Sequence, residues 1–141
     1  MITAITTGAY DLFHIGHLNL LRNASKECDR LIVGISSANR IFKYKNKIPV
    51  FSDNDRLEIV KSCRYVYDAF LNDGEPDDIE SYTKWAKLYN ANKWFVGTDW
   101  GNSDKWKNIE NELSLLNCKL VYLPHTDGIS TTDIIKNIKN N

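Results

Sequence analysis

The sequence has few of the features that mark disulfide scaffolds, zinc proteins or nucleic-acid binders. It has only three cysteines, an odd number with no CxxC pair, so neither a disulfide framework nor a zinc site is expected. Acidic and basic side chains balance to a formal net charge of zero, whereas nucleic-acid-binding domains usually carry a basic excess. We therefore expect no nucleic acid as the main partner.

Long apolar runs are also missing. No stretch approaches the ~20 residues that span a bilayer, and residues 1–7 lack the basic and apolar regions of a signal peptide. The sequence predicts a cytoplasmic protein without membrane insertion. Cys28, Cys63 and Cys118 each lie beside apolar residues and are expected to be buried free thiols in a reducing compartment.

Length and composition indicate one globular domain over residues 1–141. The 141 residues are enough for a real core, and 43% hydrophobic and 26% charged residues are ordinary values for a globular protein. The chain has no linker, internal repeat or low-complexity block that would divide it.

Short apolar runs alternate with longer segments of helical period. Strands are predicted over 2–7, 31–35, 65–71, 94–96 and 120–123. Helices are predicted over 17–27, 76–89 and 105–116, and two more are predicted to begin after caps at Ser52 and Ser130. Residues 37–51 are predicted to form a mobile loop. This alternation favours an α/β fold, a Rossmann-like doubly wound parallel sheet of about five strands flanked by helices. Ligands of such sheets bind beyond the carboxyl ends of the strands.

Two histidines flank a glycine just after the first predicted strand, in the sequence His14-Ile15-Gly16-His17. The glycine allows a close approach of the backbone to a ligand, a helix N-terminus favours phosphate, and imidazoles can donate hydrogen bonds to phosphate oxygens. The alternatives are a core histidine at position 14 with a helix cap at position 17, or zinc binding, for which two ligands are too few.

Four motifs, in order along nearly the whole chain, resemble those of the cytidylyltransferases. Residues 8–17 (GAYDLFHIGH) resemble that family's G-x-F-D-x-x-H-x-G-H, and residues 126–132 (TDGISTT) resemble its R-T-E-G-I-S-T-T. Between them, residues 64–66 (RYV) and 97–100 (GTDW) are similar to its R-Y-V and G-D-D-W. The chain is identified as a member of the HxGH nucleotidyltransferase superfamily, most similar to the glycerol-3-phosphate cytidylyltransferases.

The resemblance implies transfer of CMP from CTP to a small phosphorylated alcohol, with glycerol 3-phosphate as the leading acceptor. The products would be CDP-glycerol, or a related CDP-alcohol, and pyrophosphate, and the pathway would be surface-polymer, teichoic acid or capsule synthesis. It also implies Mg²⁺ on the triphosphate and a homodimer. Three alternatives stay open: another acceptor such as phosphocholine, phosphoethanolamine or a different polyol phosphate, an adenylyltransferase of the same superfamily, and a non-catalytic nucleotide-binding protein.

The resemblance also implies the site residues. Those expected to act in catalysis are His14, His17, Lys45, Lys47, Ser130 and Thr131. Those expected to bind the nucleotide are Thr7, Gly8, Ala9, Tyr10, Asp11, Gly16, Arg64, Asp99, His125, Thr126, Gly128 and Ile129. For Asp11, ordering of the first loop and a contact to Mg²⁺ are open alternatives, and no other protein ligand to the metal is expected.

The chain departs from the family pattern at several positions. His125 stands where the family has arginine, so either it is protonated beside the triphosphate or the site suits a different acceptor. Thr98 replaces the first aspartate of G-D-D-W. Residues 73–89 form a longer segment than in the relatives, and its Tyr82, Trp85 and Tyr89 are expected in core and dimer packing rather than in ligand contact.

Overall fold

The computed structural model describes residues 1–97, 103–124 and 130–141. This part of the chain contains five strands and six helices. The strands are β1 (Thr3–Gly8), β2 (Arg30–Ser36), β3 (Asp68–Asn72), β4 (Lys93–Gly97) and β5 (Lys119–Leu123). The helices are α1 (Ile15–Ser25), α2 (Ala38–Lys45), α3 (Asp53–Lys61), α4 (Glu80–Tyr89), α5 (Asp104–Ser114) and α6 (Thr131–Asn140).

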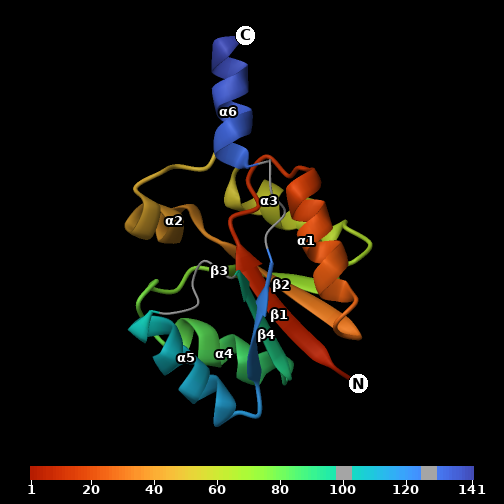
Figure 1. Ribbon diagram of the computed structural model, residues 1–141. Coiled ribbons are helices and arrows are strands. Elements are labelled where there is room, and N and C mark those ends of the chain that lie inside the picture. The colour runs from red at the N-terminus through yellow and green to blue at the C-terminus, as the bar shows by residue number, and fades with distance from the viewer. Residues whose placement is uncertain (98–102, 125–129) are drawn as a thin grey trace.

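All five strands join one parallel sheet in the order β3-β2-β1-β4-β5. The chain builds outward from β1 to β3 and then returns to the other side of β1, so the order reverses between β1 and β4. Figure 1 shows helices on both sides of this sheet. The predicted Rossmann-like α/β fold is confirmed, and the carboxyl ends of all strands meet at one edge.

Alternate strand residues supply two apolar layers, because successive side chains of a strand point to opposite faces. One layer packs against α4 and α5, and the other against α1 and α3. The first layer contains Ile5, Ile32 and Trp94 from the strands with Tyr82, Ile109 and Leu113 from the helices. The second contains Ala4, Val33 and Phe95 with Leu21 and Val60.

The prediction of a mobile loop over residues 37–51 is wrong for its first half, which is α2. Ser37 caps this helix by accepting a hydrogen bond from the backbone N–H of Arg40, and Asn46 ends it in the left-handed conformation with φ of 53°. Only Arg40 and Ile41 of this helix are buried. The segment therefore has the polar composition of a loop although both of its ends carry helix caps.

Three element boundaries also differ from the prediction. Helix α1 begins at Ile15 rather than His17, and β3 begins at Asp68 rather than Tyr65. Helix α4 begins at Glu80 because Pro76 lies in a preceding turn, which the backbone hydrogen bond from Asp78 to Glu75 closes. The predicted caps at Ser52 and Ser130 are confirmed.

The three cysteines are free thiols, as predicted, but only Cys118 is buried, whereas Cys28 and Cys63 are half-buried. Trp85 packs against the core and stacks on Phe70, with ring centroids 3.9 Å apart. This agrees with the core packing expected for that aromatic segment. No helix within the described part of the chain is long and apolar enough to cross a bilayer.

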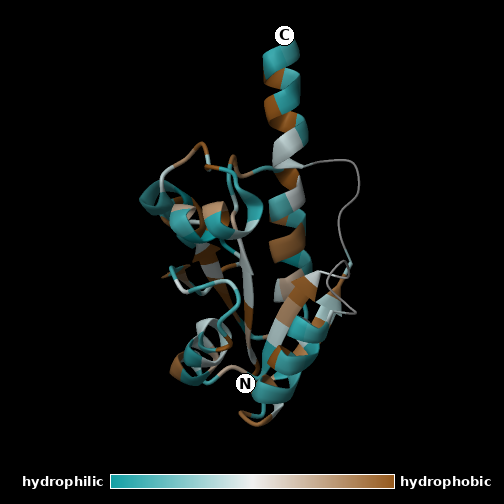
Figure 2. Cartoon of the chain, turned by 90° about the vertical axis from the view of Figure 1, so that its left-hand side faces the viewer, coloured by the Kyte–Doolittle hydropathy of each residue, from teal (hydrophilic) through white to brown (hydrophobic). Residues whose placement is uncertain are grey.

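Helix α6 stands clear of the body beyond the carboxyl edge of the sheet (Figures 1 and 2) and has no buried residue. Both hydrophobic and hydrophilic segments are visible along it in Figure 2. Its first turn is tied to the loop after β1, because the Thr131 hydroxyl donates to the carbonyl oxygen of Asp11 at 2.8 Å. The contact joins residues 120 positions apart in the sequence.

Candidate active site

The two histidines of the H-I-G-H segment form the N-terminal cap of α1. The Nδ1 atom of His14 accepts the backbone N–H of Gly16 at 3.0 Å, and the Nδ1 atom of His17 accepts the backbone N–H of His14 at 3.2 Å. The two bonds make a reciprocal capping box in which imidazoles replace the usual hydroxyl and carboxylate. Neither histidine is a core residue, and position 14 rather than 17 is the cap.

These bonds fix the tautomer of both rings. A nitrogen that accepts a hydrogen bond carries no proton, so in each neutral ring the proton lies on Nε2. The rings stack with centroids 3.8 Å apart and an interplanar angle of 23°. The cap therefore presents two Nε2–H donors side by side and connects each to a backbone amide at the positive end of the helix.

Burial keeps both imidazoles neutral. It lowers the pKa of His14, and it lowers the pKa of His17 from 6.5 to about 4, with a further contribution from His14 and a partial opposing one from Asp11. Protonation of Nδ1 would also turn the acceptor of the cap into a donor facing another donor. Near pH 7 the pair therefore acts as two neutral hydrogen-bond donors.

A pH titration should detect this state. We expect the ring carbon-bound protons of His17 to titrate near pH 4 in NMR spectra of the ligand-free protein. The unfolded chain binds this proton near pH 6.5, so the free energy of unfolding should fall as the pH is lowered from 6.5 toward 4. A His17 pKa near 6.5 in the folded protein would contradict the capping geometry.

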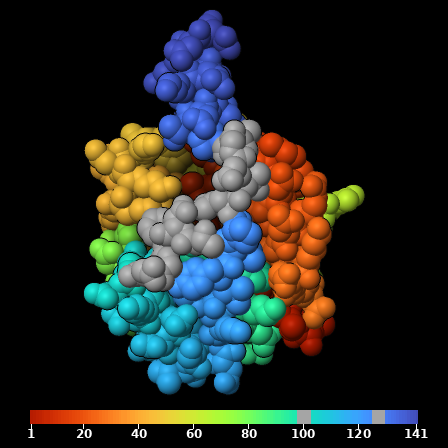
Figure 3. Space-filling model, viewed as in Figure 1, coloured from red at the N-terminus to blue at the C-terminus, as the bar shows by residue number. Residues whose placement is uncertain are grey.

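A pocket of about 670 Å³ lies between this cap and the start of α6. Figure 3 shows a hollow below α6, beside α2 in yellow. Most of its lining comes from residues predicted for the site: Thr7, Gly8, Ala9, Tyr10, Asp11, His14, Gly16, His17, Lys45, Lys47, Ser130 and Thr131. All six residues predicted to be catalytic thus line one cavity, although their individual roles remain predictions.

The two lysines enter from the end of α2 and the residue just beyond its cap. Lys47 Nζ lies 3.5 Å from the hydroxyl of Thr132 in the first turn of α6, and Lys45 Nζ lies 5.4 Å from the centroid of the Tyr44 ring. Both lysines are exposed. The pocket thus combines two cations, two neutral imidazole donors and a helix N-terminus, which together favour a polyanion such as a triphosphate.

Asp11 orders the loop that leads from α2 to α3. Its carboxylate accepts the backbone N–H groups of Val50 at 2.7 Å and Phe51 at 2.9 Å, and its own carbonyl accepts the Thr131 hydroxyl. The carboxylate thus orders the loop before α3 rather than its own first loop, and a contact to Mg²⁺ stays a prediction. Through this residue the loop after β1, the loop before α3 and the start of α6 are held together around the pocket.

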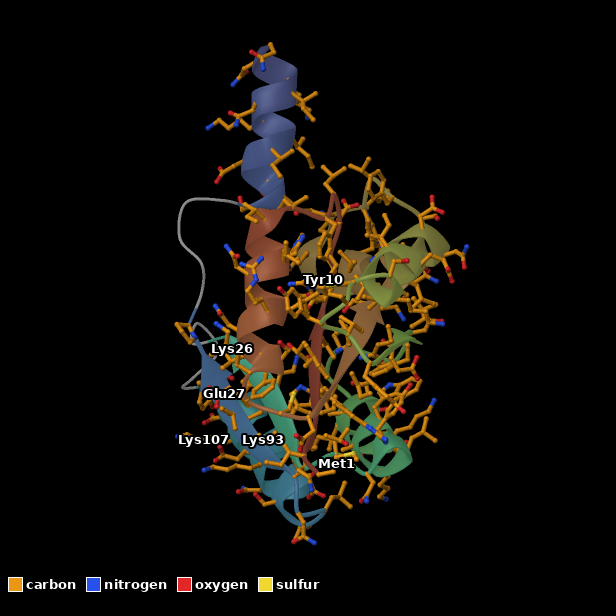
Figure 4. All side chains as sticks on the ribbon, turned by 90° about the vertical axis from the view of Figure 1, so that its right-hand side faces the viewer. Met1, Tyr10, Lys26, Glu27, Lys93 and Lys107 are labelled. Carbon is orange, nitrogen blue, oxygen red and sulfur yellow. The ribbon has the colours of Figure 1, made fainter. Side chains whose placement is uncertain are left out.

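Two predicted residues, Arg64 and Tyr10, are placed differently from the rest. Arg64 is exposed and does not line the pocket; it donates to the Tyr65 hydroxyl at 3.0 Å. Tyr10 lines the pocket, but its ring is buried in the core with φ of 52° at its backbone, and Figure 4 shows it inside the body beside α1. The remaining predicted residues lie outside the described part of the chain: Asp99, His125, Thr126, Gly128 and Ile129.

The sequence-based prediction missed Arg56, a fully buried arginine of α3. Its guanidinium donates to the carbonyl oxygens of Ala9 at 3.0 Å and Ser36 at 2.7 Å, and so it joins the segment that follows β1 to the last residue of β2. The signal was its spacing four residues before the core residue Val60, which places both on one helix face. The apolar lining was missed as well: Leu20, Ile41, Ile48, Pro49 and Ile135.

Comparisons with known proteins agree with this geometry. A family model described as Cytidylyltransferase-like matches residues 5–137. Glycerol-3-phosphate cytidylyltransferase of Staphylococcus aureus is 33% identical over 139 residues, which cover 95% of this chain and 92% of that protein. FAD synthase of Pyrococcus abyssi is 28% identical over 142 residues, covering 97% and 92% of the two chains.

The fold has a counterpart among solved structures. The lipopolysaccharide core biosynthesis protein of Thermoplasma volcanium superposes with a TM-score of 0.70 at 22% identity, over 92% of this chain and 99% of that one. At this identity the likeness concerns the fold alone.

Proposed function

We propose that this chain transfers CMP from CTP to a small phosphorylated alcohol, with sn-glycerol 3-phosphate as the leading acceptor. The premise is that the chain belongs to the cytidylyltransferase-like family of nucleotidyltransferases. The observation that carries the proposal is the single cavity shared by the His14–His17 cap, two lysines and the start of α6. The homodimer and the link to surface-polymer synthesis stay predictions from the family resemblance.

The proposed reaction is a direct displacement at the α-phosphorus of CTP. An oxygen of the acceptor phosphate forms the new P–O bond, and the bond from the α-phosphorus to the bridging oxygen breaks, so pyrophosphate leaves with the electron pair. The attacking oxygen is already anionic, so the step requires no general base. Positioning and neutralisation of charge are then the main contributions of the protein.

Each group of the pocket has a part in this scheme. The Nε2–H groups of His14 and His17 donate to the α-phosphate oxygens and strengthen those bonds as negative charge grows there. Lys45 and Lys47 neutralise the β- and γ-phosphates as point charges, and the amide groups that open α6 after Ser130 favour the same oxygens.

Mg²⁺ would be carried by the triphosphate, where it would neutralise phosphate charge. Asp11 is the one carboxylate among the described residues that line the pocket, and a carboxylate that accepts two N–H groups keeps further lone pairs. The described residues hold no cluster of three or more metal-ligating side chains.

Asp11→Asn distinguishes the two roles of this residue. The amide keeps one acceptor oxygen and turns the other position into a donor that faces a backbone N–H, so we expect a loss of about 1–3 kcal/mol in the free energy of unfolding. The Mg²⁺ concentration for half-maximal turnover should change less than twofold. A large increase in that concentration, with unchanged stability, would instead make Asp11 a metal ligand.

The function is tested by incubating the protein with CTP or ATP, Mg²⁺ and a panel of acceptors, followed by mass identification of the product. We expect pyrophosphate and CDP-glycerol from CTP and glycerol 3-phosphate. A preference for ATP would favour an adenylyltransferase, and a CDP conjugate of phosphocholine or phosphoethanolamine would change the acceptor. Binding of CTP without turnover across the panel would leave a non-catalytic nucleotide-binding protein.

A further inference from the structure

A second, smaller pocket of about 200 Å³ adjoins the first at the carboxyl edge of the sheet. The two cavities share Thr7, Gly8 and Leu20. The second extends toward the ends of β2, β4 and β5 and is lined in its polar part by Ser36, Arg40, Tyr44, Tyr82 and Lys105. None of the assigned phosphate contacts lies in this pocket, because His14, His17, Lys45 and Lys47 line only the first.

The outstanding feature of this second pocket is a buried cation. Arg40 is 6% exposed, and its guanidinium donates to the carbonyl oxygen of Gly74 at 2.8 Å and to the Tyr82 hydroxyl at 3.1 Å. Both partners are neutral, and none of the ion pairs found among the described residues includes Arg40. A guanidinium has five N–H donors, so the side chain keeps donors toward the cavity, and its charge has no carboxylate partner among the residues that the structure describes.

The rest of the lining has the same electrostatic character. Lys105 contributes a second cation, whose Nζ lies 3.6 Å from the exposed carboxylate of Asp77. No aspartate or glutamate is among the described residues that line this pocket. A buried charge without a counter-charge is costly, and an anionic ligand would supply the missing partner.

We infer that the second pocket holds the acceptor, with Arg40 binding its phosphate. This inference rests on the proposed function and deepens it. The acceptor class is a short phosphorylated polyol, because the volume is small and the charged and hydroxyl groups of the lining suit a phosphate and its alcohol groups. The cavities meet at Thr7 and Gly8, so an acceptor phosphate held by Arg40 faces the α-phosphate of a nucleotide in the first pocket.

The test compares Arg40→Gln and Arg40→Lys with Arg30→Gln in steady-state assays. Arg30 is a matched control: it also lies over a tyrosine ring, with its guanidinium carbon 4.5 Å from the Tyr67 centroid, but it is the first residue of β2, at the opposite edge of the sheet. For Arg40→Gln we expect KM for glycerol 3-phosphate to rise about ten- to a hundredfold, in line with lost charged hydrogen bonds, while KM for CTP changes less than twofold.

Arg40→Lys keeps the charge without the planar fork and should lie between wild type and Arg40→Gln. A second measurement needs no variant: in ¹⁵N-labelled wild type, the Arg40 Nε–H resonance should shift with glycerol 3-phosphate and stay in place with glycerol. Two results would overturn the assignment. One is an Arg40→Gln variant that raises KM for CTP and not for glycerol 3-phosphate, and the other is an Arg40 Nε–H resonance that does not shift with glycerol 3-phosphate.

Failure of this inference and failure of the proposed function give different results. If wild type makes CDP-glycerol while Arg40→Gln keeps a normal KM for the acceptor, the function stands and the assignment of the second pocket is wrong. If wild type turns over no acceptor, the proposed function fails. The Nε–H shift with glycerol 3-phosphate then decides alone whether the second pocket binds phosphorylated polyols.

Discussion

Replacement of His17 by asparagine should lower kcat about a hundred- to a thousandfold, the usual cost of one well-placed donor to a developing anion. The asparagine amide oxygen can take the place of Nδ1 and accept the backbone N–H of His14, which bonds to Nδ1 at 3.2 Å in the wild type. Nothing in the variant replaces the Nε2–H. The rate is measured by pyrophosphate release at saturating CTP and glycerol 3-phosphate.

Two further variants separate catalysis from capping. His17→Ala loses both nitrogens, so it should match His17→Asn in rate but lose about 1 kcal/mol of stability with the cap. His14→Asn is the equivalent change at the other ring, where the amide oxygen can accept the N–H of Gly16. Near-normal kcat in His17→Asn would remove its Nε2–H from the mechanism and leave this histidine with a structural role alone.

The capping box explains why neutral imidazoles suit this site. The backbone amides of His14 and Gly16, which would otherwise point to a ligand from the start of α1, are bonded to the imidazoles. Each imidazole then extends the polarity of an amide to a donor several ångströms farther out. The helix N-terminus acts on phosphate through the two rings, and their low proton affinity keeps the Nε2–H pattern unchanged near pH 7.

The sequence predicts the parallel sheet for a physical reason. It also predicts that the His14–His17 segment and the Ser130–Thr131 segment lie close together at one edge of that sheet. A continuous apolar run such as Leu31–Ile35 is typical of a strand covered on both faces, as in a parallel sheet, and parallel strands put their carboxyl ends at one edge. Helix α2 was not predictable in the same way, because only Arg40 and Ile41 of it are buried.

Roles that depend on tertiary contacts were hidden from the sequence. Arg40 and Arg56 are as hydrophilic in sequence as the exposed Arg64, yet their guanidinium groups lie among carbonyl oxygens from distant segments. The contacts of the Asp11 carboxylate to the backbone N–H groups of Val50 and Phe51 were equally hidden. In each case at least one partner is a backbone group, whose position no residue letter records.

Arg56→Leu should lower the free energy of unfolding by about 3–5 kcal/mol, as is usual when one partner of a buried charged network is removed. The side chain is fully buried, and it donates to the carbonyl oxygens of Phe51, Ala9 and Ser36 as well as to Asp53. Leucine fills part of the volume but leaves three carbonyl oxygens without this donor.

The substitution should also disturb the pocket, because the same guanidinium links the loop of Ala9 to α3. It also binds Asp53, whose carboxylate accepts the backbone N–H of Ala38 at the start of α2. Urea unfolding at pH 7 measures the change, with Arg30→Leu at the opposite edge of the sheet as the control expected within ~0.5 kcal/mol of wild type. Because lysine keeps the charge with fewer donors, Arg56→Lys should recover part of the loss. A loss below ~1 kcal/mol in Arg56→Leu would mean that water satisfies these carbonyl oxygens, and Arg56 would then be dispensable for holding the loops around the pocket.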